Sequence, residues 1–351
     1  MIRVLVVDDS AVVRGLLVRT LESESDITVV STAMHGEMAL KRLRADSVDL
    51  VILDVEMPVM DGLETLRHIQ REFPDVPVIM ASTLTSRGAE TTLRALGLGA
   101  AACVAKPTAE NLSSSIDELR SELIPLVRAI GCKTTPSGPK NPVFASNQPR
   151  PAGPRVTPQL IVIGTSTGGP LALKTVLSGL PPDFSTPIAI VQHMPPKFTT
   201  MLAKHLTQDT GRNCREAVDG QPIERGNTYV APGDYHLLID KQGDELVTIL
   251  NREPPEHYCR PSVNPLFRTA AEWYGRAVLG VMLTGMGDDG IEGSRSVVEH
   301  GGWVIAQDES SSVVWGMPGA VVRAGLAHRV LPLNGVAGAI LDLCSRKVAV
   351  S

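Results

Sequence analysis

Leu160-Ile-Val-Ile-Gly-Thr-Ser-Thr-Gly-Gly-Pro170 is the stretch that decides the fold of the second half of the chain. Its apolar residues predict a buried parallel strand, its glycines predict a tight corner, and the helical period of Leu171 to Leu177 predicts a helix. Gly164 to Gly168 match the G-x-S-x-G elbow, which lifts a serine oxygen clear of a sheet. Ser166 is therefore a candidate nucleophile. A phosphate-binding or merely tight turn is the alternative, because the glycines also resemble a loosened dinucleotide loop.

The composition is that of a globular protein with two domains. A chain of 351 residues, of which 43% are hydrophobic and 20% charged, is too long for one ordinary core. A formal net charge of -5 without a Lys/Arg-rich run argues against a nucleic-acid surface. No apolar run is long enough to cross a bilayer, and the chain enters a strand at Ile2, so we expect neither a signal peptide nor membrane insertion. The 5 cysteines lack C-x-x-C spacing, which favours reduced thiols and a cytoplasmic location.

Residues 1–125 alternate between apolar strands and helical patterns, which predicts a parallel sheet covered on both faces. Ser10 is a suitable N-cap for the first helix. Strands are expected at Ile2–Val7, Asp49–Leu53, Pro77–Ala81 and Ala100–Ala105. The polar residues that end or follow these strands are Asp8, Asp9, Asp54, Ser82 and Lys106. Because sites in such sheets form beyond the carboxyl ends of the strands, we expect these side chains in one crevice.

Three carboxylates in one crevice are costly unless a hard cation neutralises them, and oxygen ligands suit Mg²⁺. The set and its order resemble the receiver domain of two-component response regulators, a flavodoxin-like fold with a five-stranded parallel sheet. The resemblance implies that Asp54 accepts a phosphoryl group from a histidine kinase. It also implies that Asp8, Asp9, Asp54 and the backbone carbonyl of Glu56 bind Mg²⁺. Ser82 and Lys106 would bind the phosphoryl oxygens, with Lys106 preceding a cis Pro107.

One position in the first domain departs from the receiver pattern. Cys103 stands where receivers commonly carry an aromatic switch residue. We interpret Cys103 as a small buried hydrophobe. From about 131 to 158 the chain then holds seven prolines and little apolar periodicity, which predicts a flexible, semi-extended linker to a second domain at 159–347.

Two further strands of the second domain end in residues that suit catalysis. Pro187–Gln192 leads into His193, whose ordinary pKa near neutrality suits a general base. The alternative is a structural histidine, and His205 and His236 compete with it, although neither follows an apolar strand. Ala277–Leu283 leads into a loop, Thr284 to Gly290, whose glycines expose backbone N–H groups that suit an oxyanion. One of its two carboxylates, Asp288 or Asp289, could orient a histidine.

Several long motifs in the second domain occur together. They are Gly164 to Pro170, Val191 to Pro195, Tyr229 to Asp234, Arg260 to Val263, Leu283 to Gly290, Ala306 to Asp308 and Gly316 to Pro318. Together they resemble the chemotaxis protein-glutamate methylesterases (CheB family). The resemblance implies a doubly wound, mostly parallel α/β domain with Ser166 as nucleophile, His193 as base and Asp289 as the orienting acid. It implies supporting roles for Thr167 and Met286, the Met286 N–H being an oxyanion donor.

The activity implied by the resemblance is a serine-type hydrolysis of glutamyl methyl esters on methyl-accepting chemoreceptors, with release of methanol. The same chemistry would deamidate selected receptor glutamines, and it would need no cofactor. A chemotaxis histidine kinase would be the phosphodonor, and the unphosphorylated receiver would cover the Ser166 cleft. Asn264 departs from the family, which often has aspartate there, and the segment from Asn251 to His257 is atypical.

Three other classes of protein fit the sequence less well than a hydrolase. A receiver joined to a catalytically silent docking domain is disfavoured because serine, histidine and aspartate are all present after apolar strands. A nucleotide-dependent oxidoreductase is disfavoured because Ser166 replaces the middle glycine of the dinucleotide loop. A DNA-binding regulator is disfavoured by the negative charge and the strand-rich second domain.

Overall fold

The computed structural model describes residues 1–82, 86–106, 112–131 and 156–345. The chain divides into two compact units, Met1–Asn147 and Gln148–Ser351. The linker predicted at 131–158 lies almost entirely outside the described residues, and so does Pro107. In the described part, no helix is long and apolar enough to cross a membrane.

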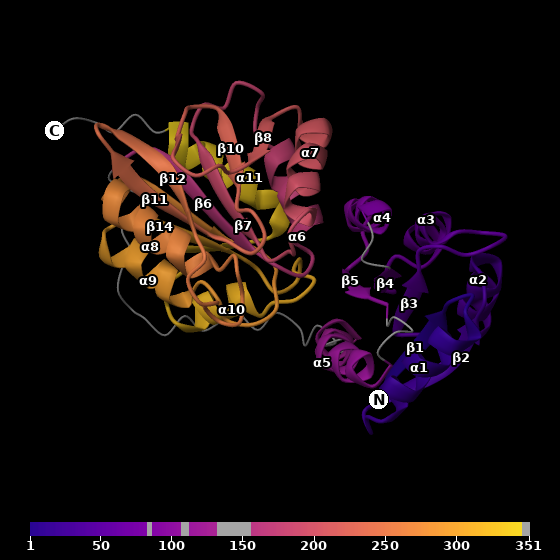
Figure 1. The fold of residues 1–351 in the computed structure, drawn as a ribbon. Helices are drawn as coiled ribbons and strands as arrows, with labels where there is room; N and C mark the ends of the chain where they lie inside the picture. Colours follow the sequence, from indigo (N-terminus) through magenta and orange to yellow (C-terminus); the bar gives the residue numbers. More distant parts are fainter. Residues whose placement is uncertain (83–85, 107–111, 132–155, 346–351) are drawn as a thin grey trace. The chain divides into compact units, whose positions relative to one another are not determined.

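The first unit is a five-stranded sheet in the order β2-β1-β3-β4-β5, with every pair parallel. Its elements, drawn in indigo to purple in Figure 1, are β1 (Ile2–Val7), α1 (Ala11–Glu22), β2 (Ile27–Ala33), α2 (Gly36–Ala45), β3 (Leu50–Asp54), α3 (Gly62–Glu72), β4 (Val78–Ser82), α4 (Ser86–Gly97), β5 (Ala102–Ala105) and α5 (Leu112–Gly131). The predicted five-stranded parallel sheet is confirmed.

Local signals set the boundaries of the first unit. Strand β3, four apolar residues followed by Asp54, is buried along its whole length, as expected for a central strand of a covered parallel sheet. Helix α1 begins at Ala11 because the Ser10 hydroxyl accepts the Val13 N–H, as its sequence position predicts. Asp54 and Ser82 are the last residues of β3 and β4, so each strand ends one residue later than expected.

The second unit is built on a seven-stranded sheet in the order β15-β14-β13-β6-β7-β10-β8, again with every pair parallel. Its elements are β6 (Leu160–Thr165), α6 (Gly169–Ser178), β7 (Ile188–Gln192), α7 (Phe198–Thr210), β8 (Asn213–Glu216), β9 (Gln221–Pro222), β10 (Asn227–Val230), β11 (His236–Gln242), β12 (Glu245–Asn251), α8 (Val263–Tyr274), η2 (Gly275–Ala277), β13 (Val278–Met282), α9 (Ile291–Glu299), β14 (Trp303–Gln307), α10 (Met317–Arg323), β15 (Arg329–Leu331) and α11 (Leu333–Ser345). A small antiparallel sheet, β11-β12-β9, is added to it. The predicted α/β class is confirmed.

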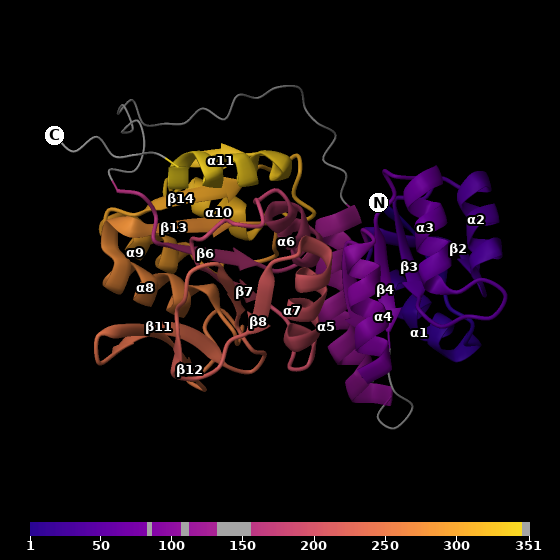
Figure 2. The same cartoon turned by 90° about the horizontal axis from the view of Figure 1, so that it is seen from above.

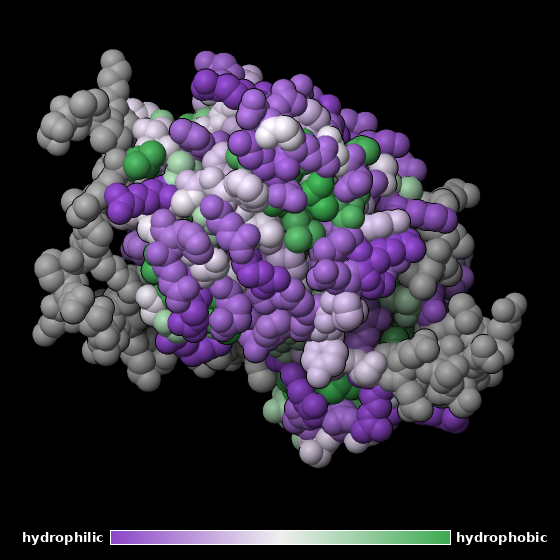
Figure 3. All heavy atoms as spheres, turned by 60° about the vertical axis from the view of Figure 1, so that its left-hand side comes forward, coloured by the Kyte–Doolittle hydropathy of each residue, from purple (hydrophilic) through white to green (hydrophobic). Residues whose placement is uncertain are grey.

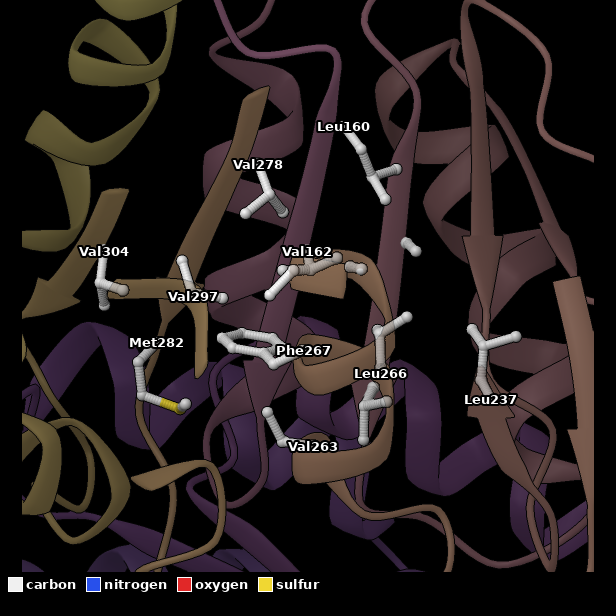
Figure 4. Packing of buried hydrophobic residues seen from close by; sticks show 14 of the residues in the cluster. Leu160, Val162, Leu237, Val263, Leu266, Phe267, Val278, Met282, Val297 and Val304 are labelled. Carbon is white, nitrogen blue, oxygen red and sulfur yellow. The ribbon is translucent and has the colours of Figure 1, made fainter. Parts of the chain in front are cut away.

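Helices cover both faces of the seven-stranded sheet. Figures 1 and 2 show α8 and α9 on one face and α6, α7 and α11 on the other. Figure 4 shows the core on the first face, where the Phe267 ring of α8 lies among aliphatic side chains of the sheet and of α9. The ring approaches β13 closely at Gly280, where an added Cβ would meet it at 3.1 Å. Burying a phenylalanine of this kind stabilises a fold by about 1.5–3 kcal/mol.

The order of the strands decides where a site can form. The chain passes from β6 to β7 on one side and later returns to β13 on the other side of β6. The loops after β6, β7 and β13 therefore leave from three neighbouring strands, at the point where the winding reverses. Ligand sites in open α/β sheets form at such switch points.

Candidate active site and phosphoacceptor site

Ser166 directly follows β6, at the tight corner expected from its glycines. Its backbone N–H donates to the Thr284 carbonyl at 3.0 Å, which ties the corner to the loop after β13. Gly168 has a φ of +79°, and an added Cβ there would lie 2.6 Å from Val313. A glycine is therefore required before α6. The side chain of Ser166 is partly exposed, as a nucleophile must be.

His193 directly follows β7, just as Ser166 directly follows the neighbouring strand β6. The last paired residues of the two strands are Thr165 and Gln192, and the His193 N–H donates to the Thr165 carbonyl at 3.1 Å. Neighbouring parallel strands lie about 4.8 Å apart, so the next residues, Ser166 and His193, begin as neighbours at the edge of the sheet.

Asp289 is the carboxylate that meets the histidine. Its Oδ2 lies 2.8 Å from His193 Nε2, and its side chain is only 2% exposed. The other carboxylate of the loop, Asp288, is exposed and pairs with His257 at 2.8 Å. With Nε2 engaged by Asp289, Nδ1 is the ring nitrogen that remains for proton transfer.

The pKa of each partner reflects this contact. Burial lowers the pKa of His193, but its hydrogen bond to Asp289 and the neighbouring Cys259 outweigh burial and raise the pKa to about 9. Burial raises the pKa of Asp289, but the hydrogen bond from His193 and those from Val263 and Ser262 outweigh burial and hold it below its ordinary range. Both shifts have the direction expected of a histidine and a carboxylate that stabilise each other's charged form.

Two residues that sequence reasoning missed hold Asp289 in place. The Ser262 hydroxyl donates to Asp289 Oδ1 at 2.8 Å, and the Val263 N–H donates to Oδ2 at 2.7 Å. His236, fully buried, in turn accepts the Ser262 N–H at Nδ1 (3.2 Å) and lies 3.2 Å from the Pro254 carbonyl at Nε2. This pattern requires neutral His236 with its proton on Nε2. His236 therefore supports the site through the backbone and does not compete with His193.

Cys259 is a third residue that sequence reasoning did not place in the site. Its sulfur lies 3.5 Å from His193 Nδ1, the nitrogen that Ser166 would use. Within the part of the chain that the structure describes, no hydrogen bond joins the Ser166 hydroxyl to His193. The structure thus brings His193 and Asp289 into contact, and it places Ser166 beside them without closing the hydroxyl–imidazole bond.

Two backbone N–H groups, in the loops after β6 and β13, are candidate donors to an oxyanion. Over the described ranges, the N–H groups of Thr167 and Met286 donate to no protein acceptor. The Ser166 carbonyl, which shares a peptide plane with the Thr167 N–H, accepts the Gln192 amide at 2.9 Å, and this bond helps to fix that plane. Donors of this kind are the usual ligands of a tetrahedral intermediate.

The glycine corner is filled by protein, which disfavours a dinucleotide loop. An added Cβ on Gly169 would lie 1.9 Å from Gln192 Oε1. The Gln192 amide donates to the carbonyls of Ser166 (2.9 Å) and His193 (3.2 Å), linking the two loops. The Gln192 side chain thus packs directly against the glycine corner.

Asn264, the departure from the family pattern, has a structural role. It is buried, and its Oδ1 accepts the Gly293 N–H at the start of α9 at 2.8 Å. It therefore satisfies one of the orphan donors of that helix. An aspartate could accept the same bond.

The first unit gathers its predicted site residues at the carboxyl edge of its sheet. Oxygens of Asp8, Asp9 and Asp54 lie within 4.8 Å of one another. Lys106 Nζ lies 2.9 Å from Asp8 Oδ2 and 2.6 Å from Asp54 Oδ1. Among the described residues, the buried Asp54 Oδ2 has no hydrogen-bond partner. The donor set and this free oxygen fit a hard cation such as Mg²⁺.

Burial is the main influence on the Asp54 carboxyl. It raises the pKa of Asp54 to about 6, against the lowering effect of Lys106. Burial also lowers the pKa of Lys106, but its bonds to Asp54 and Asp8 outweigh burial and raise it. Ser82 is buried and its carbonyl accepts the Lys106 N–H at 2.9 Å, which places both residues at the same edge.

Cys103 is half-buried, which is less than expected for a core residue. Its sulfur lies 3.7 Å from the Thr92 hydroxyl, on α4. Although the residue as a whole is half-buried, burial of its thiol raises the pKa of Cys103 to about 12, which favours the protonated thiol over the thiolate. In the described part of the chain, Cys214, Cys259 and Cys344 are also free thiols.

The fold and the two sites define a response regulator whose second unit is built as a hydrolase. The family model for the CheB methylesterase matches residues 161–340, and the response regulator receiver domain matches residues 4–117. The chain belongs to the CheB methylesterase family.

The sequences of known relatives align with nearly the whole of this chain. A protein-glutamate methylesterase/protein-glutamine glutaminase of Paramagnetospirillum magneticum is 47% identical, covering 99% of this chain and 97% of its own length. Another from Caulobacter vibrioides is 48% identical, covering 99% and 100%. The crystal structure of the Thermotoga maritima CheB methylesterase catalytic domain is 40% identical with a TM-score of 0.52, covering 54% of this chain and 100% of that one.

Proposed function

We propose that the protein hydrolyses glutamyl γ-methyl esters on methyl-accepting chemoreceptors, releasing methanol, and that it deamidates particular receptor glutamines. The observation that carries this proposal is the 2.8 Å contact between His193 and Asp289, on loops adjoining Ser166, in a chain of the CheB methylesterase family. The relatives' names give both activities. The proposal includes a cytoplasmic location, where reduced thiols are expected.

In the first half of the reaction, neutral His193 accepts the Ser166 proton as the serine oxygen attacks the ester carbonyl. Nδ1 takes this proton, because Nε2 is engaged by Asp289. The imidazolium that forms is stabilised by the carboxylate, and such positioned proton transfer contributes about 10²- to 10⁴-fold in rate. Cys259 must yield its place at Nδ1 when the Ser166 hydroxyl approaches.

The tetrahedral intermediate carries a negative charge on the former carbonyl oxygen. The N–H groups of Met286 and Thr167 would hold that oxygen, and losing one such donor costs on the order of 10²- to 10³-fold in rate. His193 then protonates the departing methanol. Water repeats the cycle on the acyl-enzyme and leaves a glutamate. A glutamine side chain would follow the same path and release ammonia.

The first unit would regulate this chemistry. Asp54 would accept a phosphoryl group from a chemotaxis histidine kinase, and Ser82 and Lys106 would bind its oxygens. Asp8, Asp9, Asp54 and the Glu56 carbonyl would hold Mg²⁺, which neutralises charge among the carboxylates. The unphosphorylated receiver would inhibit the enzyme by covering the Ser166 cleft. This regulation is supported by a complete phosphoacceptor cluster and a hydrolase cluster in one chain.

The test is methanol release from a methylated chemoreceptor, with and without a phosphodonor and Mg²⁺. Ser166→Ala should abolish release while leaving phosphorylation of Asp54 intact. Residual activity near that of the wild type would refute the assignment of the nucleophile. Ser178→Ala, at the end of α6 and away from the three loops, is the matched control and should retain activity.

A further inference from the structure

Gln192 is a polar side chain buried inside the second unit. Figure 3 shows that hydrophilic residues cover most of the face drawn there, as is usual for folded proteins. Gln192 instead ends the otherwise apolar strand β7 and is only 2% exposed. Ala189 and Val191 belong to the core beside α8, so alternation along the strand turns Gln192 to the opposite face, toward α6. A buried amide in such a place needs hydrogen-bond partners.

The partners of the Gln192 amide are two carbonyls in the catalytic loops. Its Nε2 donates to the Ser166 carbonyl at 2.9 Å and to the His193 carbonyl at 3.2 Å. Among the described residues, the buried Oε1 has no hydrogen-bond partner. Turning the amide over would bring Oε1 against two carbonyl oxygens, so the two bonds from Nε2 determine its orientation. Within the described part of the chain, the amide therefore serves the loops after β6 and β7 alone.

The glycine corner before α6 leaves room for this amide. A Cβ added to Gly169 would lie 1.9 Å from Gln192 Oε1 and 2.6 Å from Thr165 Oγ1. Gly169 is not among the glycines with a positive φ, so its backbone alone does not require glycine. The side chains of Gln192 and Thr165 therefore explain why residue 169 carries none.

The Ser166 carbonyl belongs to the peptide that carries the Thr167 N–H, a candidate oxyanion donor. This carbonyl accepts the Gly169 N–H at 2.8 Å as well as the Gln192 amide. Two donors on one carbonyl hold the plane of the peptide, and they polarise the N–H at its other end. Gln192 thus acts on the Thr167 N–H without touching it.

The second candidate donor, the Met286 N–H, is held in a similar way. The carbonyl of its peptide, that of Gly285, accepts the N–H groups of Gly316 (3.0 Å) and Met317 (2.9 Å). Both of these donors come from the backbone. The Gln192 amide is the donor that comes from a side chain, so it is the support of the oxyanion site that a substitution can remove.

We propose that Gln192 is a positioning residue for the hydrolase, which aligns the Thr167 N–H with the developing oxyanion and ties it to the His193 loop. The inference rests on the serine mechanism of the proposed function. An aligned donor gains strength as negative charge develops on the carbonyl oxygen, so Gln192 stabilises the transition state more than the bound ester. Loss of its amide should therefore lower kcat and leave KM nearly unchanged.

The first experiment replaces the amide in the full chain while keeping the length of the side chain. Gln192→Met removes both donated hydrogen bonds, and Gln192→Glu puts a second oxygen where the amide nitrogen lies. Each should lower kcat on a methylated chemoreceptor fragment by about tenfold or more, with KM changed by less than about twofold. An unchanged kcat in both variants, or a rise in KM that accounts for the whole loss, would overturn the inference.

Thr207→Val is the control for a loss of hydrogen bonds that is only structural. The Thr207 hydroxyl donates to the carbonyls of Ala203 (3.0 Å) and Cys214 (2.8 Å), which joins α7 to β8 away from the three catalytic loops. Thr207→Val should lower the melting temperature and leave kcat unchanged. A fall in kcat equal to that of Gln192→Met would contradict a specific role of Gln192.

A labelling experiment separates this role from the choice of substrate. A fluorophosphonate reacts with an activated serine whatever the natural ester: the Ser166 oxygen bonds to phosphorus, fluoride leaves, and His193 takes the serine proton. The rate of labelling should fall about tenfold in both Gln192 variants and stay unchanged in Thr207→Val. Slower labelling of the variants, in a protein whose wild type hydrolyses no receptor ester, would refute the proposed function alone. Hydrolysis by the wild type, with labelling and kcat unaltered in both variants, would refute the role of Gln192 alone.

Discussion

Gly285 lies so close to Ser166 that a Cβ on residue 285 would be 2.9 Å from the Cβ of the serine. The same atom would lie 2.4 Å from the Met317 sulfur. Because the Gly285 N–H also donates to the Val314 carbonyl at 3.0 Å, the backbone there has little room to withdraw. The position of the nucleophile thus depends on a missing side chain in another loop.

Gly285→Ala should therefore displace Ser166 and lower kcat by about 10²-fold, since small misplacements of a reacting group have effects of that size. We expect a destabilisation of about 1–3 kcal/mol from overpacking. Methanol release and urea denaturation measure the two effects. Gly338→Ala, in α11 where an added Cβ meets nothing within 4 Å, is the control. Full activity in Gly285→Ala would contradict the close packing.

The pH dependence of the reaction should follow His193. Because the base must be neutral and its pKa is raised to about 9, kcat/KM on a small ester should rise as the pH rises toward 9. In the Ser166→Ala protein, an NMR titration should report the same pKa, and Asp289→Asn should lower it. If Asp289 is intact and the pKa of His193 is nevertheless at or below the ordinary 6.5, stabilisation of the imidazolium by Asp289 is contradicted.

The contact between His193 and Asp289 also determines how the free energy of unfolding changes with pH. A raised pKa of His193 means that the folded state binds the proton more tightly than the unfolded state. Its contribution to the free energy of unfolding is therefore fully present below pH 6.5 and is lost as the pH rises through about 9. Asp289→Asn should remove this loss, and urea denaturation between pH 6 and pH 10 measures it.

Phosphorylation of Asp54 should depend on Mg²⁺ held by three carboxylates. Asp9→Asn removes one of them at an exposed position, and we expect the Mg²⁺ affinity to fall by at least about tenfold. Calorimetric titration with Mg²⁺ measures the affinity, and removal of Mg²⁺ with EDTA should stop phosphorylation by an acyl phosphate. Asp75→Asn, an exposed carboxylate away from the strand ends, should change neither result.

Removing the first unit should raise the basal esterase activity if the unphosphorylated receiver covers the cleft. A chain that begins at Gln148 keeps every element from β6 onward. Coupling free energies of about 1–3 kcal/mol correspond to a stimulation of about 5- to 150-fold. The rate of methanol release from the shortened chain, compared with the phosphorylated full chain, measures this. A shortened chain no faster than the unphosphorylated protein would exclude occlusion.

Strand ends were the most predictable part of the site. Asp54, Ser82, Ser166 and His193 all end or follow apolar runs, and parallel strands bring such positions to one edge whatever the loops do. Their placement therefore needs only the hydrophobic pattern and the strand order. The choice of Asp289 over Asp288 came from the family resemblance, because neighbouring residues in a loop have the same sequence context.

Contacts that depend on how one loop packs over another could not be predicted. Cys259 and Ser262 follow no strand, and they reach the site only because the segment before α8 crosses it. His236 follows no apolar strand, so the sequence pattern does not place it at the site, yet its ring supports the Ser262 backbone. Such contacts are long-range in sequence and arise from packing, which no local pattern records.

The three loops of the hydrolase site start from adjacent strands β7, β6 and β13. The hydrogen bonds between these strands, which are buried and regular, consequently set the spacing of the first residues of the three loops. Insertions at the tips of surface loops would leave this frame undisturbed, and so would changes in the outer strands. The tips of these loops could therefore be redesigned for another substrate while Ser166, His193 and Asp289 keep their relative positions.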